Sequence, residues 1–197
     1  CLNEKNNISL IKKNIDLFNN SKHLIVDGGS YDNSKVFYKK NKLNFIIYYP
    51  SRGAQHLKGA ELSNTKWLFF LHADTELNKR NILEVQNFIN QQGSDKVAFF
   101  KLSFKNKNFY SKTISAWANF RTNVFKLPFG DQGLIINRDY YFKLGGHSKK
   151  KIMEDIDFII KVPKKNRVLL KSKVSTSFKR FEKNGIIFQG TIHILCQ

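Results

Sequence analysis

Two short apolar runs, each ending on an aspartate, constrain the fold of this chain more than any other feature. Residues 23–26 run into Asp27-Gly28-Gly29-Ser30, and residues 67–71 run into His72-Ala73-Asp74. Each run has the length and composition of a strand buried on both faces, as in a parallel sheet. Ligands of open α/β sheets bind in the crevice outside the carboxyl ends of such strands. The two acids therefore predict a site for a phosphorylated ligand and its metal at one sheet edge.

Predicted helices and strands alternate over the first half of the chain. Helical segments are expected at residues 8–18, 32–40, 53–63 and 81–91. The strands between and after them are expected at residues 24–26, 43–49, 67–71 and 97–104. This alternation predicts a parallel sheet with right-handed crossovers.

The pattern changes after residue 105. An aromatic-rich helix is expected first, and the elements of this half lie at residues 110–125, 133–136 (strand), 138–144, 156–162 and 168–177 (strand). No internal repeat, low-complexity segment or long linker divides the chain. We therefore expect a single domain over residues 1–197.

Composition excludes several classes of protein. Hydrophobic residues make up 41% of the chain, and no apolar run approaches the roughly eighteen residues of a membrane span, which favours a folded globule. The net charge of +19 fits a compositional excess of lysine on solvated faces, weak attraction to a membrane surface, or nucleic-acid binding. Only six of the 34 basic residues are arginines, and no zinc-finger or RRM signature is present, so we expect no specific nucleic-acid partner.

The two ends of the sequence give information on the cell compartment of the protein and on whether the sequence is truncated. Cys1 and Cys196 form no metal-binding spacing or disulfide framework, which fits a reducing compartment. The chain does not begin with Met and is still apolar where it stops, so we expect truncation at both ends and leave a leader or an anchor open. The expected location is cytoplasmic, or peripheral at the inner face of the membrane.

Two segments that follow predicted strands have residues suited to holding a nucleotide. Asp27-Gly28-Gly29, with Asp32 close behind, combines an acid with glycines that let backbone amides approach a ligand. The same residues are also ordinary turn chemistry. Arg52 opens a predicted helix directly after a strand, where it can add charge to amides that favour phosphate. The alternative is a solvated arginine on a capped surface helix.

Three further segments are candidates for metal binding and proton transfer. Asp74 ends the most apolar strand, where a carboxylate can hold Mg²⁺ or Mn²⁺ together with diphosphate and water, or can cap the next turn. The adjacent His72 is either a second ligand or a hydrogen-bonded core residue. Glu154-Asp155 starts a helix, where the pair can complement the helix dipole or supply a general base for an attacking hydroxyl. Gly130-Asp131-Gln132 places another acid before a short strand.

The order of these segments is more specific than any one of them. Asp-Gly-Gly-Ser-x-Asp, Arg-Gly-x-Gln, Leu-His-Ala-Asp-Thr, Gly-Asp-Gln-Gly and Met-Glu-Asp-x-Asp follow one another in this sequence. Together they resemble the family 2 glycosyltransferases of GT-A fold, and within them the bacterial subgroup associated with radical-SAM/selenodomain genes. The resemblance runs from Asn3 to about Glu182. It implies an α/β, nucleotide-diphospho-sugar transferase fold, with a Rossmann-like mixed sheet flanked by helices.

The resemblance also implies roles for individual residues. Donor binding in a nucleotide-sugar half at residues 1–104 falls to Asp27, Gly28, Gly29, Asp32, Arg52, Gln55 and Ala73. Asp74 matches the last acid of the metal-binding Asp-x-Asp motif, so Mg or Mn is the expected cofactor. Asp155, with Glu154 beside it, matches the catalytic base. The acceptor-side motif, in a half at residues 105–197, is matched by Gly130, Asp131 and Gln132.

The sequence departs from the family pattern at three points. His72 stands in place of the first acid of Asp-x-Asp, and Gly28 stands in place of an aspartate in the frequent Asp-Asp-Gly-Ser. The family's first strand should precede Asn3 and is expected to be missing. In that fold it lies between the strands that end at Asp27 and Asp74.

We expect a metal-dependent, inverting transfer of a sugar from a nucleotide-sugar donor to an acceptor hydroxyl. A nucleotidyltransferase of related fold is the alternative among enzymes, since it also handles nucleotides with a metal and an acid. A basic protein that binds an anionic polymer or a membrane surface is the alternative outside enzymes, and it predicts salt-sensitive binding without a divalent ion. The position of the acids at strand ends disfavours this non-enzymatic alternative.

Overall fold

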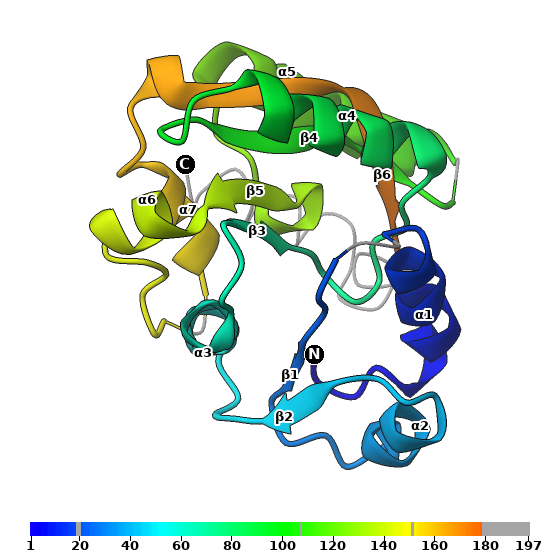
Figure 1. Cartoon of the computed structure of the whole chain (residues 1–197). Coiled ribbons are helices and arrows are strands. Elements are labelled where there is room, and N and C mark those ends of the chain that lie inside the picture. Colours follow the sequence, from blue (N-terminus) through cyan, green and yellow to red (C-terminus); the bar gives the residue numbers. More distant parts are fainter. Residues whose placement is uncertain (19–20, 107, 151, 179–197) are drawn as a thin grey trace.

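Two β-sheets carry the fold (Figure 1). In the computed structural model, which describes residues 1–18, 21–106, 108–150 and 152–178, the smaller sheet pairs β1 (Ile25–Asp27) in parallel with β2 (Phe45–Ile47). The larger sheet has the strand order β3 (Trp67–Phe70), β5 (Leu134–Asn137), β4 (Val97–Phe104), β6 (Arg167–Thr176). β5 runs antiparallel to both of its neighbours, whereas β4 and β6 are parallel. The mixed sheet that the family resemblance implies is therefore present, and its antiparallel strand is β5, which comes from the half of the chain after the alternating pattern ends.

The helices follow the apolar spacing of the sequence. They are α1 (Ile8–Asp16), α2 (Ser34–Lys40), α3 (Arg52–Leu62), α4 (Lys79–Gln91), α5 (Phe109–Phe125), α6 (Arg138–Lys143) and α7 (Glu154–Ile159). Short 3-10 turns cover Lys5–Asn7 (η1), Gly130–Gln132 (η2) and Lys164–Asn166 (η3). Side chains cap several starts: Asn78 accepts from two backbone N–H groups of α4, and Asn108 accepts from Ser111 N of α5.

The larger sheet is covered on both faces, which explains why β4 reads as a continuous apolar run. Val97 and Phe99 pack in a core with side chains of α3, α6 and α7. Ala98 and Phe100, which point the other way, pack in a second core with side chains of α4. Burial on both faces removes the polar alternation that a half-exposed strand would show.

Helix α3 lies between the two sheets (Figure 1). Its Ala60 is fully buried in the core of the larger sheet, and the same helix contacts β1 of the smaller sheet. β1 ends on Asp27 and the loop after β3 contains Asp74, and in the described part of the chain the two strands belong to separate sheets.

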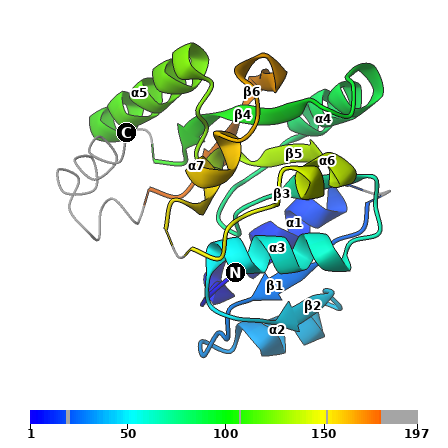
Figure 2. The same ribbon diagram turned by 90° about the vertical axis from the view of Figure 1, so that its left-hand side faces the viewer.

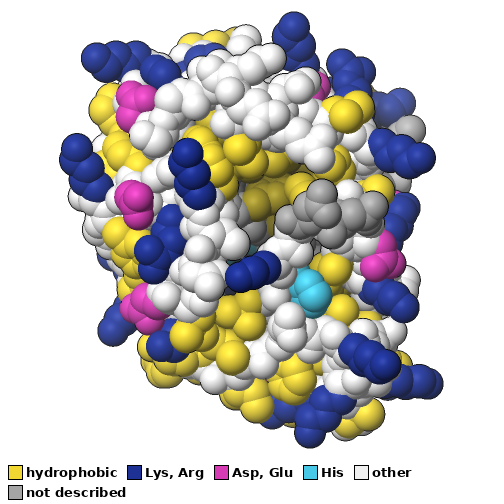
Figure 3. All heavy atoms as spheres, viewed as in Figure 1, with side chains coloured by type: hydrophobic (Ala, Val, Ile, Leu, Met, Phe, Trp, Pro, Cys, Tyr) yellow, Lys and Arg dark blue, Asp and Glu magenta, His cyan; other side chains and the backbone are white. Residues whose placement is uncertain are grey.

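Positive charge covers much of the surface. On the face seen in Figure 3, Lys and Arg side chains project around the whole outline, whereas Asp and Glu side chains are sparse. None of the helices among the described residues combines the length and the hydropathy that crossing a membrane requires.

Candidate active site

The Asp27 carboxylate is buried and engaged by the turn that follows β1. Its Oδ1 accepts hydrogen bonds from the backbone N–H groups of Gly29 (2.8 Å) and Ser30 (2.6 Å), and its Oδ2 accepts one from Ser30 Oγ (2.7 Å). Gly29 has a φ of +91°, a conformation that residues with a side chain rarely adopt. Asp32 acts similarly, because it accepts from Ser34 N (3.0 Å) at the start of α2. These two acids shape the turn between β1 and α2.

Gln55 ties α3 to the end of β1. Its Nε2 donates to the carbonyl oxygens of Val26 (2.8 Å) and Cys1 (2.9 Å), and the Cys1 oxygen also accepts from Gly28 N (2.8 Å). Ala73, from the loop after β3, packs against the core of the smaller sheet. Among these predicted donor-binding residues, Gln55 therefore uses its side-chain amide to donate hydrogen bonds to backbone carbonyl groups at the end of β1.

Arg52 and Glu154 join α3 to α7. Arg52 Nε lies 3.0 Å from Glu154 Oε1, and the Glu154 side chain is only 1% exposed. Burial raises the pKa of the Glu154 carboxyl, and the nearby Arg52 guanidinium acts in the opposite direction. Ser51 adds a second link, because its hydroxyl donates to the carbonyl oxygens of Lys149 and Lys150 (2.9 Å each). A predicted donor-binding arginine thus pairs with a predicted catalytic acid.

The loop after β3 presents the Asp74 carboxylate. Asp74 is partly exposed, and within the part of the chain that the structure describes no hydrogen bond or ion pair engages its carboxylate. Its neighbours are firmly held: Asn14 Nδ2 donates to Thr75 O (2.7 Å), and Glu76 N donates to Ser175 O (2.7 Å). An unpartnered carboxylate therefore stands on well-anchored backbone at the carboxyl end of β3.

Asp155, Gly130 and His72 meet at one point. Gly130 N donates to Asp155 Oδ2 (2.6 Å), while Asp155 Oδ1 accepts from Ile156 N (2.8 Å). A Cβ added to Gly130 would lie 2.8 Å from His72 Nε2 and 3.3 Å from Asp155 Oδ2, so the backbone of residue 130 passes close to both side chains. The fold thereby brings together three segments that are far apart in sequence: the loop after β3, the turn η2 and the start of α7.

Gln132 holds the η2 turn in place. Its Oε1 accepts hydrogen bonds from Phe129 N (3.0 Å) and Thr122 Oγ1 (3.1 Å), and its Nε2 donates to Phe100 O (2.8 Å). The side chain is completely buried. Its amide therefore fastens η2 to β4 and α5, which leaves Asp131 as the polar side chain of the Gly-Asp-Gln segment that is not fully buried.

Arg121 is a site residue that the sequence patterns did not identify. It lies on α5, is 3% exposed, and its guanidinium stacks on the Phe129 ring, 3.5 Å from the ring centroid. Burial lowers the pKa of Arg121 to about 10, and the carboxylates of Asp131 and Asp155 act in the opposite direction. Within the described ranges of the chain, its Nε and Nη2 have no hydrogen-bond partner. The available signal was an arginine alone in the apolar stretch between Lys112 and Lys126.

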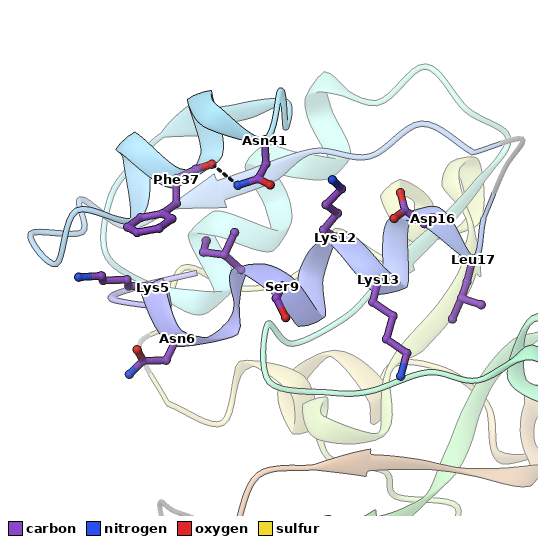
Figure 4. Close-up of a pocket in the computed structure, with 10 residues that line it drawn as sticks. Lys5, Asn6, Ser9, Lys12, Lys13, Asp16, Leu17, Phe37 and Asn41 are labelled. Atoms are coloured by element: carbon purple, nitrogen blue, oxygen red, sulfur yellow. Dashed lines mark hydrogen bonds between the residues drawn. The ribbon is translucent and has the colours of Figure 1, made fainter.

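A groove of about 580 Å³ lies away from these residues, along α1 and beside α2 (Figure 4). Lys5, Lys12 and Lys13 line it, together with Phe37 and Asn41, whose Nδ2 donates to Phe37 O (2.9 Å). None of the predicted site residues lines this groove. The candidate active site is therefore the meeting point of the β3 loop, η2 and α7.

Comparison with known proteins decides the family. The family model described as glycosyl transferase family 2 matches residues 3–157, a range that includes Asp27, Asp74 and Asp155. The chain belongs to glycosyl transferase family 2. The enzyme class expected from the order of the motifs is thereby confirmed. No curated protein sequence matches the chain.

Solved structures show that this family 2 chain has the GT-A fold. S. aureus TarS 1-349 superposes with a TM-score of 0.65 at 15% identity, covering 90% of this chain and 58% of TarS. Glucosyl-3-phosphoglycerate synthase from Mycobacterium tuberculosis, in complex with Mn²⁺, UDP-Glc and phosphoglyceric acid, has a TM-score of 0.63 at 10% identity, covering 90% and 67%. The mannosyltransferase PcManGT from Pyrobaculum calidifontis, in complex with GDP-Man and Mn²⁺, has a TM-score of 0.65 at 11% identity, covering 89% and 54%. The chain spans between about half and two thirds of the length of these proteins.

The residues of the site fit a divalent cation that is only partly held by protein. Among the described residues, no group of three or more His, Cys, Asp or Glu side chains is placed to hold a metal ion by itself. The unpartnered Asp74 carboxylate is nevertheless a hard oxygen ligand of the kind that Mg²⁺ and Mn²⁺ prefer. Such ions commonly keep several waters and complete their shell with phosphate oxygens of the substrate.

Proposed function

We propose that this chain transfers a sugar from a nucleoside-diphosphate sugar to the hydroxyl group of an acceptor, with Mg²⁺ or Mn²⁺ as cofactor. The observation that carries the proposal is the convergence of the Asp74 loop, Gly130 and Asp155 at one edge of the larger sheet. Complexes of two structurally similar proteins with Mn²⁺ and a UDP- or GDP-linked sugar support the choice of donor. The donor site would lie in residues 1–104 and the acceptor site in residues 105–197.

The donor side is proposed to work through backbone held by buried side chains. Asp27 and Gln55 fix the Gly28-Gly29 turn and the end of β1, so the shape of the backbone there would be set before the donor arrives. Arg52 would add positive charge at the start of α3, where the helix N-terminus already favours phosphate. A metal bound at Asp74 would offset the negative charge of the leaving diphosphate.

The chemical step proposed for Asp155 is a single displacement. The acceptor oxygen attacks the anomeric carbon while the bond from that carbon to the diphosphate oxygen breaks. The acceptor proton passes to a carboxylate oxygen of Asp155, and the nucleoside diphosphate leaves. Because attack and departure take place on opposite faces of the carbon, the configuration inverts. Two backbone N–H groups hold the Asp155 carboxylate in one orientation and leave each oxygen a lone pair for the proton.

The experiment that tests this function compares Asp74→Asn and Asp155→Asn with an exposed control, Asp95→Asn. A thermal-shift screen of nucleoside diphosphates with and without Mn²⁺ first identifies the base, because a ligand that binds the folded state raises the melting temperature. Hydrolysis and transfer of the corresponding sugar donors are then measured. We expect Asp155→Asn to keep metal-dependent stabilisation but to lose roughly 10²–10⁴-fold in rate. Asp74→Asn should lose the metal-dependent stabilisation itself.

Retention of normal donor turnover by both variants would overturn the proposal. Stabilisation by nucleoside diphosphate without any metal dependence would contradict the role given to Asp74. Asp95 lies in an exposed loop before β4, so Asp95→Asn should match the unchanged protein in both assays.

A further inference from the structure

Helix α5 is anchored to the rest of the molecule by one face. Ala118 packs with Leu102 and Phe104 of β4 in a small core. The Asn119 side chain accepts from Leu102 N (2.7 Å) and donates to Leu102 O (2.8 Å). Arg121 and the other buried residues of the helix lie on this same inner side. In both views α5 lies at the end of the molecule opposite to β1 and β2 (Figure 1, Figure 2).

The outer face of α5 is apolar as well. Phe109 (77% exposed), Trp117 (46%), Phe120 (55%) and Val124 (53%) follow one another at helical spacing along the side opposite Ala118. Trp117 and Phe120 stack on each other, with ring centroids 5.8 Å apart. Single exposed apolar residues are normal, but Trp117, Phe120 and Val124 form a cluster of large exposed side chains on one helix, and such a cluster marks a surface that has a partner.

The charges around this face indicate an anionic partner. Residues 105–129 contain no Asp or Glu. Lys112 lies on α5 and Lys126 directly after it, whereas Lys105 is paired with Glu76. The whole chain carries a net charge of +19, so a second copy of the chain would be repelled from this face. Aromatic side chains on one side of a helix with lysines beside them are the composition of helices that lie in the interface of a membrane.

We propose that the outer face of α5 lies on the surface of a membrane that contains anionic lipids. Phe109, Trp117, Phe120 and Val124 would enter the boundary between head groups and acyl chains. Lys112 and Lys126 would remain among the anionic head groups, where each adds to binding. The proposal rests on the surface of α5 alone and does not depend on glycosyl transfer.

The test is co-sedimentation of the full chain with large unilamellar vesicles. One set contains phosphatidylcholine and phosphatidylglycerol in equal parts, and the other contains phosphatidylcholine alone. The variant is Trp117→Ser combined with Phe120→Ser, and the matched control is Val36→Ser combined with Leu83→Ser, since these residues are equally exposed on α2 and α4. We expect the α5 variant to bind the anionic vesicles at least about tenfold more weakly than the unchanged protein does, and we expect the control to bind normally.

Three results would overturn the proposal. Equal binding of both variants would show that scattered lysines, and not α5, attract the vesicles. Failure of the unchanged protein to bind anionic vesicles at low salt would exclude the membrane directly. Light scattering that finds a dimer, converted to a monomer by Trp117→Ser with Phe120→Ser, would assign the face to a second copy. Both positions are exposed, so circular dichroism should show that the variant is folded.

Discussion

Asp27 ends β1 and Asp74 lies in the loop after β3, and their carboxylates have different surroundings. Asp27 accepts three hydrogen bonds from Gly29 and Ser30 and is completely buried. Asp74 is partly exposed, and no hydrogen bond or ion pair engages its carboxylate among the residues described. The apolar run before each aspartate predicts the strand, but it does not distinguish an acid that builds a turn from an acid that is available to a ligand.

Substitution by alanine should separate these two roles. Asp27→Ala removes every acceptor of a buried turn and leaves backbone N–H groups without partners, so we expect a loss of about 2–3 kcal/mol in the free energy of unfolding. Asp74→Ala removes no hydrogen bond or ion pair to any described residue and should change that free energy by less than about 0.5 kcal/mol. Urea denaturation followed by circular dichroism measures both. Equal losses for the two variants would show that the Asp74 loop is held by its carboxylate after all.

At the scale of elements, the packing of α3 against the segment before α7 determines whether the site assembles. A Cβ added to Gly53 would lie 1.8 Å from Ser148 O and 3.1 Å from Glu154 Cβ, a distance that backbone atoms cannot tolerate. A Cβ added to Gly59, six residues further along the same helix, would meet Val26 Cγ2 at an ordinary 3.4 Å. Of these two positions, only residue 53 must therefore be glycine, because the backbone at Ser148 passes too close for a side chain.

Gly53→Ala should move α3 away from α7 and weaken the Arg52–Glu154 pair. We expect a loss of about 1–3 kcal/mol in unfolding free energy, together with a loss of any sugar-transfer activity. Gly59→Ala is the matched control, and it should be neutral or should stabilise the protein by up to about 1 kcal/mol, because alanine favours a helix interior. Thermal denaturation of the two variants gives the comparison. A Gly53→Ala protein as stable as Gly59→Ala would contradict the close approach.

Most elements are predictable from the sequence, because each depends on local spacing. Ile8 and Ile11 mark the buried side of α1, and the run from Val97 to Phe100 marks a strand covered on both faces. The direction of β5 is not predictable in this way, because four apolar residues have the same pattern in either direction. The role of Arg121 in the site is not predictable from the sequence for a related reason. Its neighbours Phe129, Asp131 and Asp155 come from other segments, and only the fold brings them to α5.

At the scale of the whole molecule, two histidines, the partly buried His56 and the buried His147, lie where several elements meet. His56 of α3 and His147, after α6, have ring centroids 4.8 Å apart, and His147 stacks on Phe158 of α7 at 4.7 Å. Burial lowers the pKa of His56 to about 3, with the N-terminal ammonium and Arg52 acting in the same direction. Burial also lowers the pKa of His147 well below its ordinary value, and His56 and Lys161 add to this effect. Both imidazoles are therefore neutral in the folded chain near neutral pH.

These two histidines should make the protein less stable as the pH falls. In the unfolded chain each imidazole binds a proton near its ordinary pKa of about 6.5, whereas in the folded chain it does so only at much lower pH. The unfolded state therefore binds more protons below about pH 6.5, so their contribution is complete above that pH and decreases as the pH drops. The urea concentration at the unfolding midpoint should therefore decrease as the pH is lowered from about 7.5 to about 5.5, a range above the titration of ordinary carboxyl groups. His56→Leu removes one of the two groups and should make the urea midpoint depend less steeply on pH. An unchanged dependence on pH would show that His56 takes up no proton on unfolding.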